Sequence, residues 1–236
     1  MGAFFMLIWY ICSMTRRKTQ TIFENVPVID AGARGKTIAK APDGRVIFLS
    51  NTVPGDIVDI RTGKKRKAYF EGTAIKFHTY SDKRVEPACE HFEHCGGCKW
   101  QNMGYEHQLA YKENEVTNNL IRIGHLELPE VTPILGCEKT YFYRNKMEFS
   151  FSNSRWLTLD EINSSEEIDN KNACGFHISG MWDKILDVKK CHLQEDPSNA
   201  IRNFVKNFGI ENGLEFYNPR ESSGMLRTMM LRISST

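Results

Sequence analysis

The sequence predicts a β-rich α+β fold: a small antiparallel β-barrel, a cysteine-rich loop, one helix and an incomplete mixed α/β central domain. Three observations predict this order. Short apolar runs alternate with Gly/Pro turns over residues 20–78, three cysteines gather within residues 89–98, and a helical period follows at residues 105–120. The 236 residues are 41% apolar and 25% charged, which excludes a disordered, collagen-like or coiled-coil chain.

Residues 1–19 are expected to be a doubtful leader outside the fold. The first twelve are almost wholly apolar, but a membrane span needs about 20 such residues. The basic residues follow the apolar run instead of preceding it, unlike those of a signal peptide. We therefore expect Met14 to be the natural start, no membrane partner, and a cytoplasmic protein. Seven cysteines, an odd number, also argue against a secreted disulfide framework.

The barrel is expected over residues 20–78. Its strands are predicted at residues 36–39, 46–49, 57–60 and 69–75, separated by turns such as Pro42-Asp43-Gly44 and Val53-Pro54-Gly55-Asp56. Such short strands close into a barrel because a free sheet edge invites aggregation.

Charge is distributed unevenly along the chain. Residues 15–84 carry 15 Lys/Arg and seven Asp/Glu, a net charge of +8, whereas residues 85–236 carry 16 and 22, a net charge of −6. The formal net charge of +2 thus hides a basic front, which predicts a polyanion partner. A barrel with lysines on its rim suits single-stranded RNA, and the candidate contacts are Lys64, Lys65 and Lys67. The alternative is a solvated lysine-rich surface.

Aromatic side chains near this basic loop are candidates for base stacking. Aromatic residues on alternating strands usually face inward. We therefore expect two or three of these four in the core: Tyr69, Phe70, Phe77 and Tyr80.

The cysteine cluster reads Cys89-x5-Cys95-Gly-Gly-Cys98. The two glycines let the backbone wrap closely and direct its N–H groups at sulfur, which lowers the free-energy cost of gathering thiolates. This run predicts a metal or cluster site. For zinc, His91 or His94 could complete a distorted site, although a second knuckle is missing.

An iron–sulfur cluster of the [4Fe–4S] type instead requires four thiolates, commonly a tight group and a remote one. The remote candidates are Cys137, Cys174 and Cys191, because Cys12 falls in the doubtful leader. Spacing alone leaves these alternatives open.

The central region after the cysteines is predicted to hold one helix and several strands. Apolar residues from Tyr105 to Leu120 recur at helical spacing, are expected in the core, and end at Gly124 as a C-cap. A strand is expected over residues 141–151, with Arg144, Lys146 and Glu148 on one face. Residues 160–172 are expected to form an acidic surface loop, and residues 175–188 a hairpin that leads to Cys191.

Several segments of this chain resemble the bacterial RNA (uracil-5-)-methyltransferases of the iron–sulfur type that act on 23S ribosomal RNA. They are V-P-G-D at 53–56, the C-x5-C-G-G-C run, Y-R-N-K-M-E-F at 143–149, the segment from Gly175 to Leu193 that contains L-D-V-x2-C-H-L, and L-R-T-M-M-L-R at 226–232. The resemblance implies that the front barrel is an OB-like TRAM domain, and it assigns Cys89, Cys95, Cys98 and Cys191 to a [4Fe–4S] cluster. It also implies that the strand at 141–151 faces RNA, which makes Arg144 and Lys146 candidate phosphate contacts; the alternative is a solvated strand face.

The resemblance also implies the chemistry. In this family a cysteine thiolate adds to C6 of uracil, C5 takes the methyl group of S-adenosylmethionine, and a base removes the C5 proton. The family's cofactor loop (D-L-x-C-G-x-G) and D-P-P-R stretch are missing from this sequence. We therefore expect the Rossmann-type methyltransferase domain, the S-adenosylmethionine site, the nucleophile and the base to lie beyond residue 236.

Two hypotheses follow. In the first, residues 20–78 are the RNA-binding barrel and residues 79–236 a truncated cluster-bearing domain of a methyltransferase that forms 5-methyluridine in 23S ribosomal RNA, inactive alone. In the second, the chain is a free-standing RNA-binding adaptor with a structural zinc or iron–sulfur site. Ribosomal RNA is favoured because the related transfer-RNA uracil methylases typically lack both the cysteine run and the barrel. The sequence gives no sign of a stable protein partner.

Overall fold

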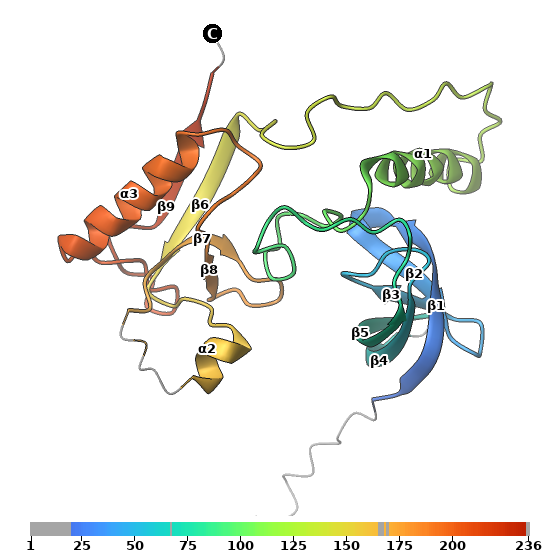
Figure 1. Cartoon of the computed structure of the whole chain (residues 1–236), viewed down its shortest axis with the longest axis horizontal. Coiled ribbons are helices and arrows are strands. Elements are labelled where there is room, and N and C mark those ends of the chain that lie inside the picture. Colours follow the sequence, from blue (N-terminus) through green and yellow to red (C-terminus); the bar gives the residue numbers. More distant parts are fainter. Residues whose placement is uncertain (1–19, 67, 165–167, 169, 235–236) are drawn as a thin grey trace, which may run out of the picture.

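The computed structural model describes residues 20–66, 68–164, 168 and 170–234. The described strands form two sheets, a closed five-stranded barrel and a four-stranded sheet. Figure 1 shows the barrel and the second sheet at opposite ends, with the cysteine-bearing segment that follows the barrel between them. The expected leader and Lys67 lie outside the described residues.

The barrel consists of β1 (Ile22–Gly32), β2 (Lys36–Lys40), β3 (Val46–Leu49), β4 (Ile57–Lys65) and β5 (Tyr69–Thr79) in the order β1-β2-β3-β5-β4. A single 3₁₀ turn, Ala33–Gly35, joins β1 to β2. The predicted strands and closure are confirmed, but a wholly antiparallel barrel is wrong. Strand β3 pairs parallel with β5, because the chain passes through β4 before β5 returns beside β3.

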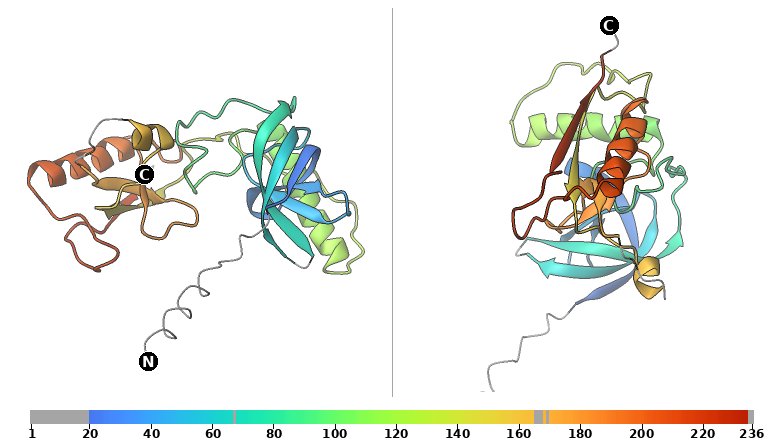
Figure 2. Two further views of the ribbon diagram at one scale, coloured as in Figure 1. Left: turned by 90° about the horizontal axis from the view of Figure 1, so that it is seen from below. Right: turned by 90° about the vertical axis from the view of Figure 1, so that its left-hand side faces the viewer.

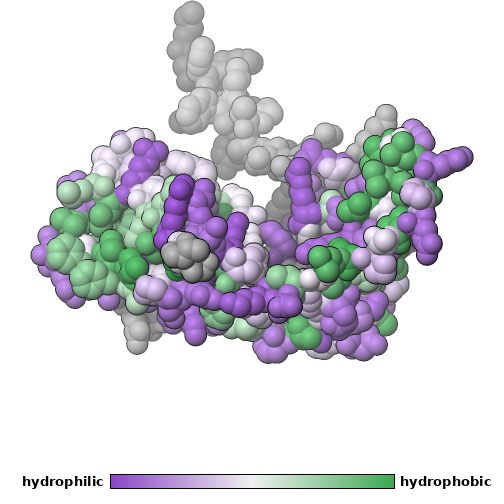
Figure 3. Space-filling model, turned by 90° about the horizontal axis from the view of Figure 1, so that it is seen from above, coloured by the Kyte–Doolittle hydropathy of each residue, from purple (hydrophilic) through white to green (hydrophobic). Residues whose placement is uncertain are grey.

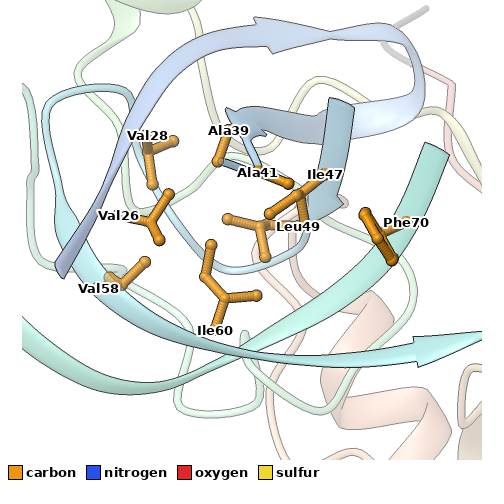
Figure 4. Close-up of a cluster of buried hydrophobic side chains, with 9 residues drawn as sticks. All are labelled: Val26, Val28, Ala39, Ala41, Ile47, Leu49, Val58, Ile60 and Phe70. Atoms are coloured by element: carbon orange, nitrogen blue, oxygen red, sulfur yellow. The ribbon is translucent and has the colours of Figure 1, made fainter. Parts of the chain in front are cut away.

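Alternation of apolar and polar residues along the strands fills the barrel. Its core consists of Val26, Val28, Ala39, Ala41, Ile47, Leu49, Val58, Ile60 and Phe70 (Figure 4). Of the aromatic residues near the basic loop, Phe70 is buried, Phe77 packs partly against the core, and Tyr80 is 65% exposed. Tyr69 is half-buried and meets Phe48 edge-to-face on β3. The expectation of two or three core aromatics thus holds only if Phe77 is included.

Helix α1 (Tyr105–Arg122) confirms the helical spacing. Its apolar residues are not core, however: none of its residues is buried, and Val116 is 59% exposed. The helix packs on β1 with only part of one face: its Tyr111 lies against the buried cluster of Ala31, Val53 and Met103, of which Ala31 belongs to β1. Gly124 donates its N–H to Asn119 O, whereas the left-handed residue that follows the helix is His125, with φ 52°.

The second sheet contains β6 (Lys146–Ser152), β7 (Ala173–His177), β8 (Ile185–Asp187) and β9 (Thr228–Arg232), in the order β8-β7-β6-β9. All three pairings are antiparallel. The predicted hairpin at residues 175–188 is confirmed. The strand predicted from residue 141 begins only at Lys146, because the preceding residues bond to the segment after β8: Phe142 N–H donates to His192 O and Arg144 N–H to Leu193 O.

Two further helices complete this half of the chain. Helix α2 (Leu159–Asn163) lies where a surface loop was predicted, and it begins with a capping box between Thr158 and Glu161. Helix α3 (Ser198–Glu211) was not predicted, and it packs on β7. Figure 2 shows α3 lying along the second sheet. The prediction of a single helix was therefore wrong.

Apolar side chains are exposed at both ends of the molecule. On α3 they include Ile201, Phe204 and Phe208, and around α1 they include Val116 and Ile123. Figure 3 shows apolar groups over both of these ends, with polar residues between them. Among the described residues, no helix combines the length and the apolar character that a membrane crossing requires.

Candidate metal centre and basic surfaces

The cysteine-rich loop lies between the barrel and the second sheet. It is a series of turns with little regular structure, and its residue Cys95 forms a β-bridge with Ile178 beyond β7. His91 Nε2 accepts the N–H of Lys189, 3.0 Å away, from the segment that follows β8. The hairpin β7–β8 is thereby held against the loop, and the chain after β8 runs directly to Cys191.

Four cysteines line one pocket between the loop and this segment: Cys89, Cys95, Cys98 and Cys191. The two other remote candidates lie elsewhere. Cys137 is exposed, with its thiol 3.0 Å from Lys139 O, and Cys174 is buried in the core of the second sheet. Cys12 falls outside the described residues. All six described cysteines are free thiols.

Backbone N–H groups point at three of the four pocket thiols. Gly97 N–H donates to Cys95 Sγ at 3.4 Å, as the glycine pair predicts. The N–H of His91 donates to Cys89 and that of Leu193 to Cys191. In each case the donor is two residues beyond the cysteine. Such donors stabilise negative charge on sulfur.

Burial opposes ionisation of the same thiols. Desolvation raises the pKa of the Cys95 thiol to about 11, with the Gly97 N–H acting in the opposite direction. The pKa values of Cys89 and Cys191 are raised for the same first reason, and neighbouring pocket thiols add to the rise. The pocket therefore gathers thiols that ionise readily only when a cationic centre compensates their charge.

The two histidines of the loop are engaged in other contacts. His91 is nearly buried, and its acceptor nitrogen is occupied by Lys189 N–H. His94 instead packs on Trp156, with ring centroids 4.6 Å apart. Among the described residues, no group of three or more His, Cys, Asp or Glu side chains is arranged to hold a single metal ion.

The remote thiol is held in place by α3, which the sequence reasoning missed. Asn199 accepts the N–H of Cys191 at 2.7 Å and donates to Cys191 O at 3.1 Å. Arg202, one helical turn further, donates to Asn199 Oδ1 at 3.0 Å and to Lys189 O at 2.6 Å. An arginine on the buried face of an amphipathic helix, between Ser198 and Gly209, is the signal that could have identified this contact.

The V-P-G-D turn anchors the segment that leads to the cysteines. Asp56 is fully buried, and it accepts the N–H groups of Val53 and Ser81 at 2.7 and 2.9 Å. Arg84 forms a bidentate pair with the same carboxylate, at 2.8 and 2.7 Å. Gly55 adopts φ 105°, and a Cβ there would lie 2.6 Å from Ser81 Oγ. The turn thus joins the barrel to the chain after β5.

The predicted RNA contacts fall on two separate surfaces. Lys64 and Lys65 are the last residues of β4, at the hairpin to β5. Arg144 and Lys146 lie at the start of β6, where they line an open groove of about 1060 Å³ with Lys139 and Arg232. Glu138 and Glu195 also line this groove, and Glu195 pairs with Lys139 at 3.1 Å. The groove therefore carries charges of both signs, with more cationic than anionic side chains.

Comparison with known proteins gives consistent matches. No protein-family model matches the chain. A Bacteroides thetaiotaomicron protein named "uncharacterized RNA methyltransferase" is 52% identical over 204 residues, which cover 86% of this chain and 45% of that protein. A Chlorobaculum tepidum protein with the same kind of name is 40% identical over 88% of this chain and 43% of its own length. The chain thus spans about half the length of the curated relatives it matches.

A solved structure gives the same class of protein. The Pyrococcus abyssi tRNA (uracil-54, C5)-methyltransferase, in complex with S-adenosyl-L-homocysteine, matches with a TM-score of 0.56 and 25% identity. The match covers 88% of this chain and 42% of that one, so it includes at least part of the barrel. The expectation that transfer-RNA enzymes lack the barrel fails for this neighbour. The chain is therefore homologous, over most of its length, to proteins named RNA methyltransferases.

Proposed function

We propose that this chain is the RNA-binding and [4Fe–4S]-bearing portion of an S-adenosylmethionine-dependent methyltransferase that forms 5-methyluridine in RNA. Residues 20–78 act as a TRAM-like RNA-binding barrel, and residues 79–236 carry the cluster. The observation that carries the proposal is the pocket at which Cys191 meets the three loop cysteines, in a chain homologous to RNA methyltransferases.

The iron–sulfur assignment follows the family resemblance, because four thiols alone suit a Cys₄ zinc site as well as a [4Fe–4S] cluster. Four thiols surround the pocket, and N–H groups reach three of them; hydrogen bonds to sulfur are a recurrent feature of iron–sulfur sites. A Cys₃His zinc site would need a free histidine nitrogen aimed at the pocket. The Nε2 atom of His91 accepts the Lys189 N–H, and His94 packs on Trp156.

The cluster acts as a structural clamp in this proposal. Methyl transfer to uracil is polar chemistry that needs no electron transfer, whereas four sulfur–iron bonds would join the loop after the barrel to the segment after β8. These segments are almost a hundred residues apart in the sequence. The bound cluster would supply those bonds, while the chain's own N–H groups and helix α3 hold the thiolates.

The RNA partner is supported by the names of the relatives and by the basic barrel. The family resemblance points to 23S ribosomal RNA, and the structural neighbour is a transfer-RNA enzyme. Both substrates share single-stranded uridine in a folded RNA. We propose ribosomal RNA, on the strength of the C-x5-C-G-G-C run.

Anaerobic purification of the chain tests the cluster. We expect about four iron and four sulfide per chain and a brown colour, with loss of iron from the Cys98→Ala variant. Zinc at one per chain, without sulfide, would refute the iron–sulfur assignment. The Cys137→Ala variant is the matched control, because that thiol lies outside the pocket, and it should keep a full cluster.

Competition binding tests the RNA class. A fragment of 23S ribosomal RNA and a transfer RNA of equal length are compared as competitors for the chain, and we expect the ribosomal fragment to compete better. Preference for transfer RNA would overturn the ribosomal assignment.

The reading frame of the gene after the codon for residue 236 distinguishes the adaptor hypothesis from the methyltransferase hypothesis. A frame that continues past residue 236 into the cofactor loop and the D-P-P-R motif supports the enzyme. A stop codon at that position supports the adaptor. Labelled S-adenosylmethionine should give no methylated RNA with this chain alone, and transfer of label would refute the placement of the catalytic residues.

A further inference from the structure

Helix α3 brings a buried positive charge to the cysteine pocket. Arg202 is 0% exposed, and its described hydrogen bonds all go to neutral oxygens: Lys189 O, Asn199 Oδ1 and Asn203 Oδ1. Its Nε has no hydrogen-bond partner in the described structure. The guanidinium also lies over the ring of Phe149, 5.0 Å from its centroid. Burying a charge without an opposite charge is costly, so this arrangement calls for a compensating anion.

The neighbouring lysine on the same helix is arranged differently. Lys206 pairs with Asp187 through a hydrogen-bonded contact at 2.5 Å, and its side chain is 22% exposed. Its charge is therefore balanced locally and reached by solvent. Arg202 has no direct carboxylate contact among the described residues; Asp187, Asp196 and the Cys174 and Cys191 thiols act on it only through longer-range electrostatics. Of these groups Cys191 belongs to the pocket, and it is linked to Arg202 through Asn199.

The hydrogen bonds of Arg202 converge on the segment that carries the remote thiol. Arg202 holds Lys189 O on one side of that segment, while His91 accepts the Lys189 N–H on the other. Asn199 bonds both backbone polar groups of Cys191: its Oδ1 atom accepts the Cys191 N–H and its Nδ2 atom donates to Cys191 O. The Oδ1 atom also accepts a hydrogen bond from the Arg202 guanidinium. The arginine therefore fixes the position of Cys191 and places its charge beside it.

We propose that Arg202 is the buried counter-charge of the cysteine site and, through Asn199, the residue that positions Cys191. This inference rests on the proposed iron–sulfur site. Four thiolates give such a cluster a net negative charge, which increases when it gains an electron. A fixed positive charge in a medium of low dielectric constant stabilises the more negative form. Arg202 thus raises the reduction potential of the cluster.

The test is a redox titration of anaerobically purified protein, with the cluster followed by its visible absorption and, when reduced, by electron paramagnetic resonance. We expect the Arg202→Gln variant, which loses the charge, to have a more negative potential than the wild type. Arg202→Lys keeps the charge and should shift the potential less. Lys206→Gln is the matched control: it removes the same charge from the same helix and should shift the potential least.

A second variant covers the case in which Arg202→Gln loses its cluster. Asn199→Asp keeps acceptors for the Cys191 N–H and for Arg202, although it loses the donor to Cys191 O. Its carboxylate neutralises the guanidinium, so this variant too should lower the potential. Equal potentials in the wild type and in every variant that retains the cluster would overturn the role of Arg202. A wild-type protein without iron and sulfide would instead overturn the proposed function, so the two failures are distinguishable.

Discussion

Replacing Cys191 by alanine removes the thiol through which the proposed cluster would link the segment after the β7–β8 hairpin to the cysteine loop. With the cluster bound, the link between Cys98 and Cys191 closes a loop of 93 residues (191 − 98). The chain-entropy expression for a cross-link gives about 4.6 kcal/mol for that length. The value is an upper estimate, because the unlinked unfolded chain keeps residual structure. For a protein of this size it corresponds to a fall in Tm of about 9–18 °C.

The assay is thermal unfolding under anaerobic conditions, with iron and sulfide measured on the same samples. We expect Cys191→Ala to lose the cluster and to melt near the temperature of the wild type from which iron has been removed by a chelator. Cys137→Ala should match the untreated wild type, since its thiol is exposed and outside the pocket. A variant that loses the cluster yet keeps its Tm would refute the clamp, and one that keeps the cluster would refute Cys191 as a ligand.

Three further changes test the parts of the chain around this site. Asp56→Ala removes the buried partner of Arg84 and should lower the free energy of unfolding by about 3–5 kcal/mol in urea denaturation. Neutralising Lys64, Lys65 and Lys67 together should reduce the salt slope of RNA binding by about 2, because each single-strand phosphate contact contributes roughly 0.7. Gly175→Ala would put a Cβ 2.1 Å from Leu186 O, so it should separate β7 from β8 and lower both stability and iron content.

Each of these changes has a matched control. Asp59→Ala, on β4, removes a half-buried carboxylate that pairs with His78 and accepts the Asn25 N–H, and it should lower stability less than Asp56→Ala; an equal loss would remove the special role of Asp56. An unchanged salt slope in the triple lysine variant would take that hairpin out of the RNA interface. Gly63→Ala is tolerable, since its Cβ would meet the nearest atom at 3.5 Å, and it should keep full iron content.

Four of the five barrel strands could be predicted from local sequence, whereas β1 and the pairing of the strands could not. Apolar runs bounded by turns marked residues 46–49, and the structure has this strand with the same bounds. The parallel pairing of β3 with β5 depends on closure of the whole barrel, and no short sequence pattern predicts such a pairing. For α1 the helix predicted from the apolar spacing is confirmed, but the predicted burial of its apolar residues is wrong. Apolar spacing indicates that a helix has an apolar face, but it does not show whether another element covers that face.

The loop cysteines were identifiable by spacing, but the choice of the remote thiol needed either the resemblance or the structure. Cys137, Cys174 and Cys191 are alike in local sequence character, and only the β7–β8 hairpin and the contacts of α3 bring Cys191 to the pocket. Arg202 was not assigned a role from the sequence. A lone arginine in a helix is ordinarily a surface residue, and its burial is a consequence of how α3 packs on β7.

The contacts on either side of the cysteine loop suggest why a cluster would be placed there. At the barrel end, Asp56 and Arg84 fix the segment that enters the loop. At the other end, His91 and Cys95 attach the loop to the second sheet. The loop itself has little regular secondary structure and is held by short-range turns, such as the bond from Cys95 N–H to His91 O, while conformational entropy opposes its order. In the proposed function, metal–thiolate bonds would tie this loop to Cys191 and would so hold the basic hairpin of the barrel and the groove beside Arg144 in a fixed arrangement for one RNA.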